Sequence, residues 1–383
     1  MWHVLTSDQE LLRDTTARFL GGQVPLSRLR KDRGNPAGFD PAYWTSGAEL
    51  GWTSLLVSEA AGGGSVSGRG AVDLALIAYE FGRHAAPGPL VDCNVVALAL
   101  SSLAGAGRAD ELHRTVLSDL LSGRGIAACC LGAAPWHGRG DATVHIRKDG
   151  DDVLIDGSVR PVESAAQAGH LLVTGMAEGG LTQVLVPANA PGVAIKPLKS
   201  LDVTRKFAAV TFDSVRAPAS ALLGEIGRAG NEVSRQVQNA AVILAAESVG
   251  AMDSAFEMTA DWMANRYTFG RALASYQALK HRFADMKSWL EASHAVSDAA
   301  AEAVADGTLL AAETASAAKA YIGEQGVELL QECVQLHGGI GVTYEHDLHF
   351  FLRRVTLGRL LYGTPADHRR MLAEIQIERE QAA

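Results

Sequence analysis

The sequence predicts a mainly helical protein with a central β-domain. We expect an N-terminal helical domain, a middle antiparallel β-barrel or sandwich and a C-terminal four-helix bundle. Proline placement is the first observation behind this fold class, since eleven of the 12 prolines lie at or before Pro218 and the next is Pro365. Proline breaks helix interiors, so the segment between these two residues can form long helices. The second observation is a series of short strand-like runs in the middle of the chain. We place the domain boundaries at residues 1–122, 123–225 and 226–383.

The proline-free segment divides into three expected helices, at residues 231–265, 277–306 and 309–335. Its alanine-rich composition favours helix, and apolar residues recur at helical spacing, as at Phe283, Met286 and Leu290. Glycine-containing breaks at residues 269–271 and 337–341 separate these helices from their neighbours. Together the three segments predict a helical bundle.

Strand-like runs of β-branched and apolar residues fill the middle region, and residues 148–151 form an expected turn between two of them. The expected strands are residues 126–131, 142–147, 153–155, 170–174, 182–186 and 207–212. Their spacing favours a small antiparallel barrel or sandwich. Upstream, to about residue 122, the chain is helical again, with glycine and proline interruptions.

Composition argues against several protein classes. The 383 residues are 48% hydrophobic and 20% charged, which is typical of a globular protein with two or three domains. The net charge of -9 argues against general nucleic-acid binding, and no apolar run reaches the roughly 18 residues of a membrane-spanning helix. The first residues do not form a secretory pattern, in which a basic start precedes an apolar stretch. Four cysteines without metal-ligand spacing complete the prediction of a cytoplasmic protein.

Two short motifs carry the chemistry of a dinucleotide-binding site. Residues 266–270 are Arg-Tyr-Thr-Phe-Gly, and residues 335–339 are Gln-Leu-His-Gly-Gly. The guanidinium of Arg266 can donate in a planar fork to a pyrophosphate, and glycine N–H groups can approach it closely because no Cβ intervenes. Gln277 or Gln335 can hydrogen-bond ribose or phosphate. Taken singly, each motif also fits a structural role, as a helix-end cation or a glycine helix cap.

The order and spacing of these motifs closely resemble the C-terminal half of the acyl-CoA dehydrogenase family of flavoenzymes. N-terminal matches, such as residues 50–52 and 80–82, extend the resemblance over nearly the whole chain. The resemblance implies an FAD that is held mainly by a neighbouring subunit, and it places Phe269 near the adenosine. The residues of this chain that it implies for FAD binding are Arg266, Thr268, Phe269, Gln277, Gln335, Gly338 and Gly339.

One position departs from the family pattern where catalysis would begin. Family members often place a Glu immediately before a late Gly-Thr, where it removes the α-proton of the substrate. In this chain Tyr362 precedes Gly363 and Thr364, and a phenol, which titrates at about pH 10, is a poor base at neutral pH. A minority of the family uses a second position, which aligns with Ala240. The resemblance therefore assigns no catalytic residue to this chain.

The residues that the family uses to hold the flavin ring also differ. The family segment Thr-Glu-Pro-x-x-Gly-Ser-Asp corresponds to residues 131–138, which contain neither Thr-Glu-Pro nor Ser-Asp. The family segment Trp-Ile-Thr/Ser, which lies against the isoalloxazine, corresponds to Pro161, Val162 and Glu163. Both losses affect the same half of the site, whereas the half that acts on a neighbouring subunit is retained. Division of labour between two unlike subunits explains this pattern best.

We therefore expect the non-catalytic subunit of a heteromeric, FAD-dependent acyl-CoA dehydrogenase, in an α2β2 heterotetramer. A homologous partner subunit would supply the catalytic Glu and the flavin-ring site, and an electron acceptor would complete the reaction. Known family members with unlike subunits act on bulky CoA thioesters. The resemblance therefore implies a bulky acyl-CoA substrate, with a steroid side-chain thioester as the specific candidate.

Two alternatives remain open. The chain could be a self-sufficient homotetramer with a relocated base, Glu247 or Asp367. Glu247 lies in an apolar helix, where burial would raise its pKa, although a partly exposed or salt-bridged Glu is commoner. The chain could also be a cofactor-free structural or regulatory homologue, because fold does not fix function. No metal site is expected, since the close pair His346 and His349 lacks supporting carboxylates.

Overall fold

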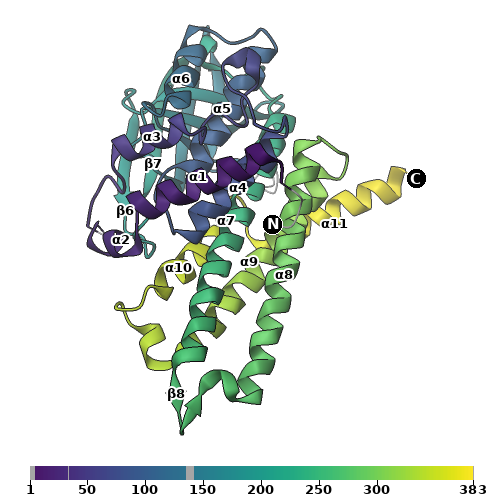
Figure 1. Ribbon diagram of the computed structural model, residues 1–383. Coiled ribbons are helices and arrows are strands. Elements are labelled where there is room, and N and C mark those ends of the chain that lie inside the picture. The colour runs from purple at the N-terminus through teal and green to yellow at the C-terminus, as the bar shows by residue number, and fades with distance from the viewer. Residues whose placement is uncertain (1–4, 33, 135–141, 383) are drawn as a thin grey trace. The chain divides into compact units, whose positions relative to one another are not determined.

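The computed structural model describes residues 5–32, 34–134 and 142–382, which Figure 1 shows as ribbons. The chain divides into two compact units. The helical unit comprises Met1–Lys31, Ala75–Ala86 and Ala241–Ala383, and the sheet unit comprises Asp32–Leu74 and Pro87–Ala240. α4 (Gly70–Arg83) and α7 (Gly230–Asn265) each have several residues in both units. The division into three domains at residues 1–122, 123–225 and 226–383 stays a prediction.

One sheet of seven strands forms the core of the sheet unit among the described residues. The strands are β1 (Ala127–Leu131), β2 (Val144–Asp149), β3 (Asp152–Glu163), β4 (His170–Ala177), β5 (Gly180–Pro187), β6 (Val193–Leu198) and β7 (Phe207–Pro218). Their order is β1-β4-β2-β3-β7-β6, and β5 pairs with β4. The prediction of a central β-domain between helical regions is confirmed.

Alternation of buried and exposed residues explains why these segments form strands. In β2, Val144 and Ile146 are buried whereas His145 and Arg147 are exposed, as the two-residue period of a strand requires. β4 and β5 are buried over most of their length, and Val173 of β4 belongs to the hydrophobic core of the sheet. The side chains that share this core therefore come from every part of the middle region.

The sheet is mixed rather than antiparallel throughout. β1 is parallel to β4, and β2 meets β4 at one parallel pair of residues, whereas the remaining pairs are antiparallel. β2 and β3 lie between β1 and β4 in the sequence, so the chain crosses over before it returns in the same direction. The sequence contains no clear signal for β6, because most of its residues are exposed and it pairs only with β7 at the sheet edge.

Helices of the sheet unit pack within that unit. α5 (Leu90–Gly105) is apolar on all sides and almost completely buried, and it contacts β1 and α6 (Glu111–Leu121). In α3 (Pro41–Glu49), the ring of Trp44 lies 6.0 Å from that of Trp52, measured between centroids. The sheet unit also contains the short 3-10 helices η1 (Glu59–Ala61) and η3 (Ala219–Ala221).

Long helices dominate the helical unit (Figure 1). They are α1 (Ser7–Gln23), α2 (Leu26–Asp32), α8 (Gln277–Ala305), α9 (Ala311–His337), α10 (Leu348–Gly358) and α11 (Pro365–Ala382), with the second halves of α4 and α7. The predicted helices at residues 231–265, 277–306 and 309–335 correspond to α7, α8 and α9 and are confirmed to within two residues at each end. Within the described ranges, no helix combines the length and apolar character needed to cross a membrane.

Glycine allows α4 and α7 to cross at backbone contact. A Cβ on Gly82 would lie 1.9 Å from the carbonyl oxygen of Glu247, and a Cβ on Gly250 would lie 2.0 Å from that of Tyr79. Any side chain at either glycine would therefore force the two helices apart. This crossing fixes the position of Glu247 against the end of α4.

Candidate functional site

A pocket of about 570 Å³ lies at one end of the helical unit. Its walls come from the ends of α7 and α9, the start of α8, strand β8 (Tyr267–Thr268), and the short helices η4 (Leu273–Ser275) and η5 (Gly338–Val342). β8 forms a hairpin with β9 (Arg271–Ala272), which does not line the pocket. Five of the seven predicted FAD-binding residues line this pocket: Arg266, Thr268, Gln335, Gly338 and Gly339. Two segments that lie almost 70 residues apart in the sequence thus meet at one site.

Arg266 directly follows the last residue of α7 and is exposed. Its N–H donates to the carbonyl of Trp262 at 2.8 Å, and its carbonyl accepts from the N–H of Leu273 at 2.9 Å. The guanidinium carbon lies 5.6 Å from the centre of the Trp262 ring, within the range of a cation–π contact. Among the residues that the structure describes, no ion pair involves this guanidinium, so it can bind an anion from another molecule.

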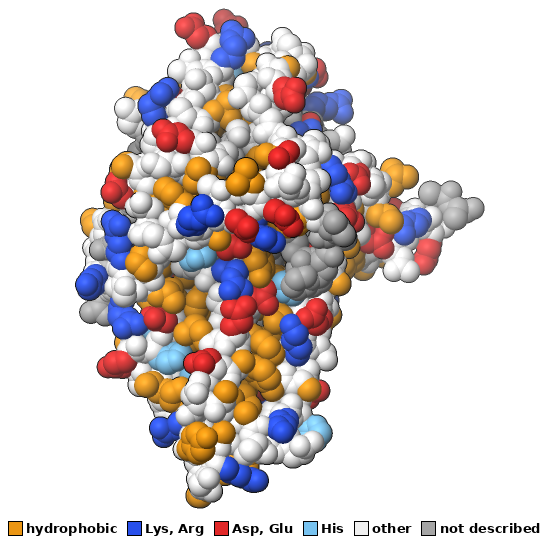
Figure 2. All heavy atoms as spheres, in the orientation of Figure 1, with side chains coloured by type: hydrophobic (Ala, Val, Ile, Leu, Met, Phe, Trp, Pro, Cys, Tyr) orange, Lys and Arg blue, Asp and Glu red, His pale blue; other side chains and the backbone are white. Residues whose placement is uncertain are grey.

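Phe269 lies at the tip of the β8–β9 hairpin. Phe269 and Gly270 both have positive φ angles, 53° and 81°, the pattern of a two-residue type I′ turn. The Phe269 side chain is 94% exposed, so it is not a core aromatic, and it is absent from the pocket lining. Hydrophobic side chains also gather over the lower ends of α7 and α8 in Figure 2. The hairpin therefore presents an aromatic ring to whatever contacts this end of the unit.

Two glycines follow the last residue of α9, and they differ in backbone conformation. Gly338 has a φ of 65° and a ψ of -140° and its N–H donates to the carbonyl of Gln335, so its backbone conformation favours glycine. Gly339 has no such φ, and a Cβ on it would meet no atom within 4 Å. No contact with the described residues therefore requires glycine at position 339. The open space leaves its backbone accessible to a ligand.

Gln277 is not brought into the pocket lining. It is the first residue of α8 and is exposed, whereas Leu279 and Arg282, which follow on the same helix, line the pocket. Residues at the start of a helix point in successive directions around its axis, and the motif spacing alone does not fix which of them faces inward. The predicted role of Gln277 stays untested.

His337 and Trp262 line the pocket, although the two motifs did not identify them as binding residues. Their rings are stacked, with centroids 5.3 Å apart and planes 18° apart. His337 Nδ1 lies 2.8 Å from the carbonyl oxygen of Cys333, and a carbonyl only accepts, so Nδ1 carries the proton. Burial lowers the pKa of His337, which keeps the imidazole neutral. The sequence could have identified Trp262 as a neighbour of the site, because it precedes Arg266 by one helical turn.

Comparison with protein families gives two matches. A model of the acyl-CoA dehydrogenase N-terminal domain matches residues 6–124, and a model of the acyl-CoA dehydrogenase C-terminal domain matches residues 231–377. The chain belongs to the acyl-CoA dehydrogenase family. It is therefore an acyl-CoA dehydrogenase by family, an oxidoreductase that acts on acyl-CoA.

Similar proteins cover nearly the full chain. The acyl-CoA dehydrogenase IpdE2 of Mycobacterium tuberculosis is 27% identical over 95% of this chain and 96% of that protein. IpdE2 of Mycolicibacterium smegmatis is 26% identical over 97% of this chain and 100% of that protein. Among solved structures, a variant of the Tcur3481-Tcur3483 steroid acyl-CoA dehydrogenase has a TM-score of 0.85 and 27% identity, and the match covers 98% of this chain and 99% of that chain.

Butyryl-CoA dehydrogenase from Megasphaera elsdenii has the same fold as this acyl-CoA dehydrogenase. The TM-score is 0.85 at 20% identity, over 98% of this chain and 100% of that chain. The predicted fold class, with helical N-terminal and C-terminal regions around a sheet, is confirmed by this likeness.

Tyr362, where the sequence resemblance led us to look for a catalytic Glu, lies in a tightly held turn. Its φ is 54°, in the left-handed region. Its carbonyl oxygen lies 3.1 Å from His368 Nε2, and Ser316 Oγ lies 3.2 Å from His368 Nδ1. Because the carbonyl only accepts, Nε2 donates and Nδ1 accepts from the hydroxyl. Burial, and then the charge of Lys319, lower the pKa of His368 to about 4.

Lys319 holds the same turn from α9. Its ammonium donates to three backbone carbonyls, those of Gly358 at 2.8 Å, Arg359 at 3.2 Å and Gly363 at 3.1 Å. Burial lowers the pKa of Lys319 to about 7. The turn is therefore ordered by the buried side chains of Lys319 and His368, and it carries no carboxylate at position 362.

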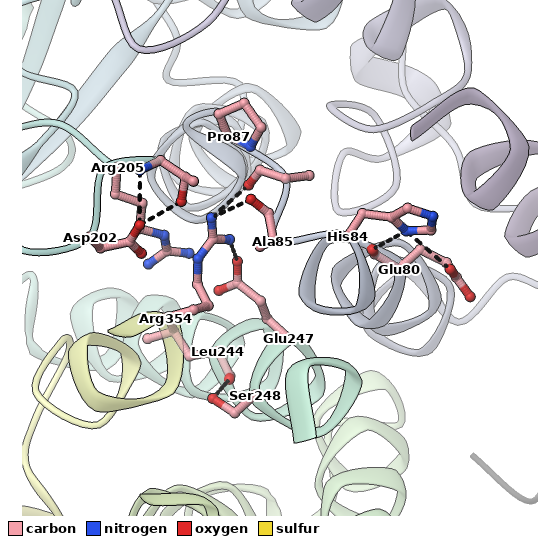
Figure 3. Close-up of polar contacts among 12 residues, drawn as sticks. Glu80, His84, Ala85, Pro87, Asp202, Arg205, Leu244, Glu247, Ser248 and Arg354 are labelled. Atoms are coloured by element: carbon pink, nitrogen blue, oxygen red, sulfur yellow. Dashed lines mark hydrogen bonds and ion pairs between the residues drawn. The ribbon is translucent and has the colours of Figure 1, made fainter. Parts of the chain in front are cut away.

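Both carboxylates considered as relocated bases have structural partners. Asp367 accepts hydrogen bonds from the N–H and hydroxyl of Thr364, at 2.9 and 2.7 Å, as a residue in the first turn of α11 can do. Burial raises the pKa of Asp367, but these hydrogen bonds outweigh it and the pKa is lowered. Glu247 is buried and accepts from the guanidinium of Arg354, which also donates to the carbonyls of Ala85 and Ala86 (Figure 3). The salt-bridged state of Glu247 is thus the one observed.

Glu163, which the sequence resemblance aligns with the family's flavin-contacting segment, lies in the sheet unit. Its carboxylate is 3.4 Å from Arg205 Nε, and both side chains are at most 5% exposed. A buried guanidinium–carboxylate pair does not supply the neutral hydroxyl donor of the family segment, and Pro161 supplies no aromatic wall. Of the other divergent segment, residues 131–134 are described, whereas residues 135–138 lie outside the described residues.

The histidine pair considered for metal binding makes aromatic contacts instead. The His346 ring lies 4.5 Å from that of His337, and the His349 ring lies 4.2 Å from that of Phe350. Over the described part of the chain, no group of three His, Cys, Asp or Glu side chains could hold a metal ion.

Proposed function

We propose that this chain is the non-catalytic subunit of a heteromeric, FAD-dependent acyl-CoA dehydrogenase, in which a homologous partner subunit carries the catalytic Glu. The observation that supports this most strongly is a contrast within the chain. A pocket gathers Arg266, Gln335, Gly338 and their neighbours, whereas position 362 carries a tyrosine in place of a carboxylate.

The residues of the pocket fit one end of a dinucleotide. When bound, FAD supplies the acceptor for the β-hydride of the acyl-CoA. The guanidinium of Arg266, which forms no ion pair with any described residue, would bind the pyrophosphate, and the open backbone at Gly339 would donate N–H groups to it. Gln335 is exposed beside them and would hydrogen-bond ribose or phosphate. Phe269 would cover the adenosine, and Gln277 would reach the same ligand from outside the pocket lining.

The flavin ring would be held by the partner. The buried pair of Glu163 and Arg205 is a poor site for an isoalloxazine. Either side chain could hydrogen-bond the ring nitrogens only if their own ion pair, which is shielded from water, were broken. The partner would then supply the base for the α-proton and the flavin-ring site, in an α2β2 assembly. An external electron acceptor would reoxidise the flavin.

The substrate we propose is a bulky acyl-CoA, with a steroid side-chain thioester as the specific candidate. The support is the similarity to the Tcur3481-Tcur3483 steroid acyl-CoA dehydrogenase, whose name joins two components. The role of this chain would be in lipid or steroid degradation. The cytoplasm is the compartment we propose, because the four cysteines are buried and unpaired.

Co-expression tests this function. The partner to use is a homologous chain with a Glu before its late Gly-Thr. The complex should carry one FAD per pair of chains, measured by flavin absorbance against protein mass, and should dehydrogenate a bulky acyl-CoA in a dye-linked assay. This chain alone should contain little flavin. Stoichiometric flavin on a pure homo-oligomer would favour the self-sufficient alternative, and a flavin-free complex would favour the cofactor-free one.

A further inference from the structure

A second guanidinium lines the pocket. Arg282, on α8, belongs to the same lining as Arg266. Unlike Arg266, it has a partner in this chain, because it forms an ion pair with Glu332 of α9. Glu332 itself is outside the lining, and it precedes Gln335 by one helical turn. Among the described residues, the Arg266 guanidinium therefore has no carboxylate partner, whereas that of Arg282 is restrained by a neighbouring carboxylate.

The restraint on Arg282 is of a kind that an anionic ligand can displace. Its side chain is 42% exposed and that of Glu332 is 22% exposed. Ion pairs with this much solvent contact are weak, because water screens the attraction. A phosphate accepts two parallel N–H bonds from a guanidinium, as a carboxylate does. A pyrophosphate, with two negative charges, can therefore replace Glu332 as the partner of Arg282.

We infer that Arg282 is a second dinucleotide-binding residue of this chain and that Glu332 sets its affinity by competing with the pyrophosphate for its guanidinium. This inference rests on the proposed function, since it assigns residues to the same pocket. It predicts effects of opposite sign for two residues that touch each other. An ion pair that only joins α8 to α9 would give effects of the same sign.

The test is FAD titration of the complex with its partner, followed by flavin fluorescence at about 0.15 M salt, where charges more than roughly 8 Å apart are largely screened. Arg282→Gln should weaken FAD binding about tenfold, because a charge-assisted contact is lost. Glu332→Gln should strengthen binding several-fold, because the competing charge is removed. Binding to the Arg282→Gln complex should also depend less steeply on salt.

A matched ion pair on the same helix provides the control. Lys287 and Glu291 of α8 form an ion pair at 2.5 Å, and neither lines this pocket. Lys287→Gln and Glu291→Gln change the charge of the chain by the same amounts as Arg282→Gln and Glu332→Gln, and should leave FAD affinity within about twofold. Melting temperatures of all variants report whether the helices still pack.

Two outcomes separate this inference from the proposed function. If Arg266→Gln weakens FAD binding but Arg282→Gln and Glu332→Gln both leave it unchanged, or both weaken it, the Arg282/Glu332 pair is structural and only this inference is wrong. If Arg266→Gln itself has no effect in an intact complex, the proposed role of the pocket is wrong. Opposite shifts for the two variants, with unchanged controls, support the inference.

Discussion

The guanidinium of Arg354 is bonded to the carboxylate of Glu247, and each side chain is at most 3% exposed. Arg354 also donates to the carbonyls of Ala85 and Ala86, at 3.0 and 2.9 Å. One buried cation therefore joins α10, α7 and the turn that follows α4 (Figure 3). Removal of either charge would break this buried pair and leave the other charge in an environment with little solvent, which is costly.

Glu247→Gln should therefore destabilise the helical unit strongly, by about 3–5 kcal/mol in the free energy of unfolding. Denaturant titration measures this. Glu257→Gln is the control, since Glu257 is 59% exposed and pairs with Arg83, and it should cost less than about 1 kcal/mol. Equal losses for the two variants would contradict the buried-pair argument. A folded Glu247→Gln complex that has lost turnover by orders of magnitude would instead identify Glu247 as the base.

Protonation of His368 should make stability depend on pH. The pKa of His368 is lowered to about 4 in the folded chain by burial and by the charge of Lys319, whereas an unfolded His titrates at about 6.5. Between these values the unfolded chain binds the extra proton, so the free energy of unfolding should fall as the pH drops from about 6.5 to about 4. The groups around the ring are Lys319, Asp367, the Ser316 hydroxyl and the Tyr362 carbonyl.

His368→Gln should remove this contribution, because glutamine does not titrate. The measurement is the difference in unfolding free energy between the parent and His368→Gln. It is made at several pH values from about 7 down to about 4, a range that covers the pKa of His368 in the unfolded and folded chain. The advantage of the parent should shrink toward acid pH. A difference that stays constant over this range would show that His368 does not titrate in the turn.

The exposed ring of Phe269 should matter to the complex and not to the isolated chain. Phe269→Asn keeps a residue that tolerates positive φ but removes the aromatic surface. The isolated chain should keep its stability to within about 0.5 kcal/mol, whereas the complex should lose roughly 1.5–3 kcal/mol of interaction with its partner or cofactor. Leu309→Ser is the control, because Leu309 is fully exposed beyond α8. Equal effects of both changes on assembly would count against a specific contact of Phe269.

Arg266→Gln should weaken FAD binding by the complex roughly ten- to a hundredfold, since a charge-assisted bond to phosphate is worth about 1.5–3 kcal/mol. Equilibrium dialysis against FAD measures the affinity. Arg271→Gln is a suitable control, because the Arg271 guanidinium stacks on Tyr276 at 3.8 Å and is outside the pocket lining. Unchanged affinity in Arg266→Gln, with assembly intact, would make Arg266 a structural cation.

Local patterns predicted the helices and most strands because their periods reflect burial on one face. The same patterns could not reveal that β1 and β4 are parallel, since this depends on the path of the chain between them. Nor could they reveal the partner of Glu247, which lies 107 residues away on α10. Arg282 escaped prediction for a similar reason, because its position in the pocket depends on how α8 packs against α9.

The two motifs indicated which segments form the pocket, but they did not indicate which of their residues line it. Arg266 and Gly338 line the pocket, whereas Phe269 and Gln277, from the same motifs or beside them, do not. The difference is geometric: Phe269 lies at a hairpin tip, and Gln277 lies at a helix start. A sequence motif records which residues were retained together, and the tertiary structure decides which of them face one cavity.

Tyr362 should not be the catalytic base, although the sequence resemblance aligns it with the usual Glu. If the partner removes the α-proton, Tyr362→Phe should leave turnover of the complex within a few-fold of the parent, whereas loss of a general base costs roughly a hundred- to ten-thousandfold. The assay is dye-linked dehydrogenation of a bulky acyl-CoA, with flavin content and assembly measured alongside. A collapse of activity in Tyr362→Phe, with both intact, would place catalysis in this chain.

Tyr362→Glu extends the same argument, because it restores the carboxylate that the position lacks. It should not create a second active site, since a base without a bound flavin ring has no acceptor for the hydride. The pair of Glu163 and Arg205 stays buried in the sheet unit of this variant, and Pro161 still replaces an aromatic wall. Flavin content should therefore stay at one FAD per pair of chains, and turnover should not rise. A gain of both flavin and turnover would mean that this chain retains a complete flavin site and lacks only its base.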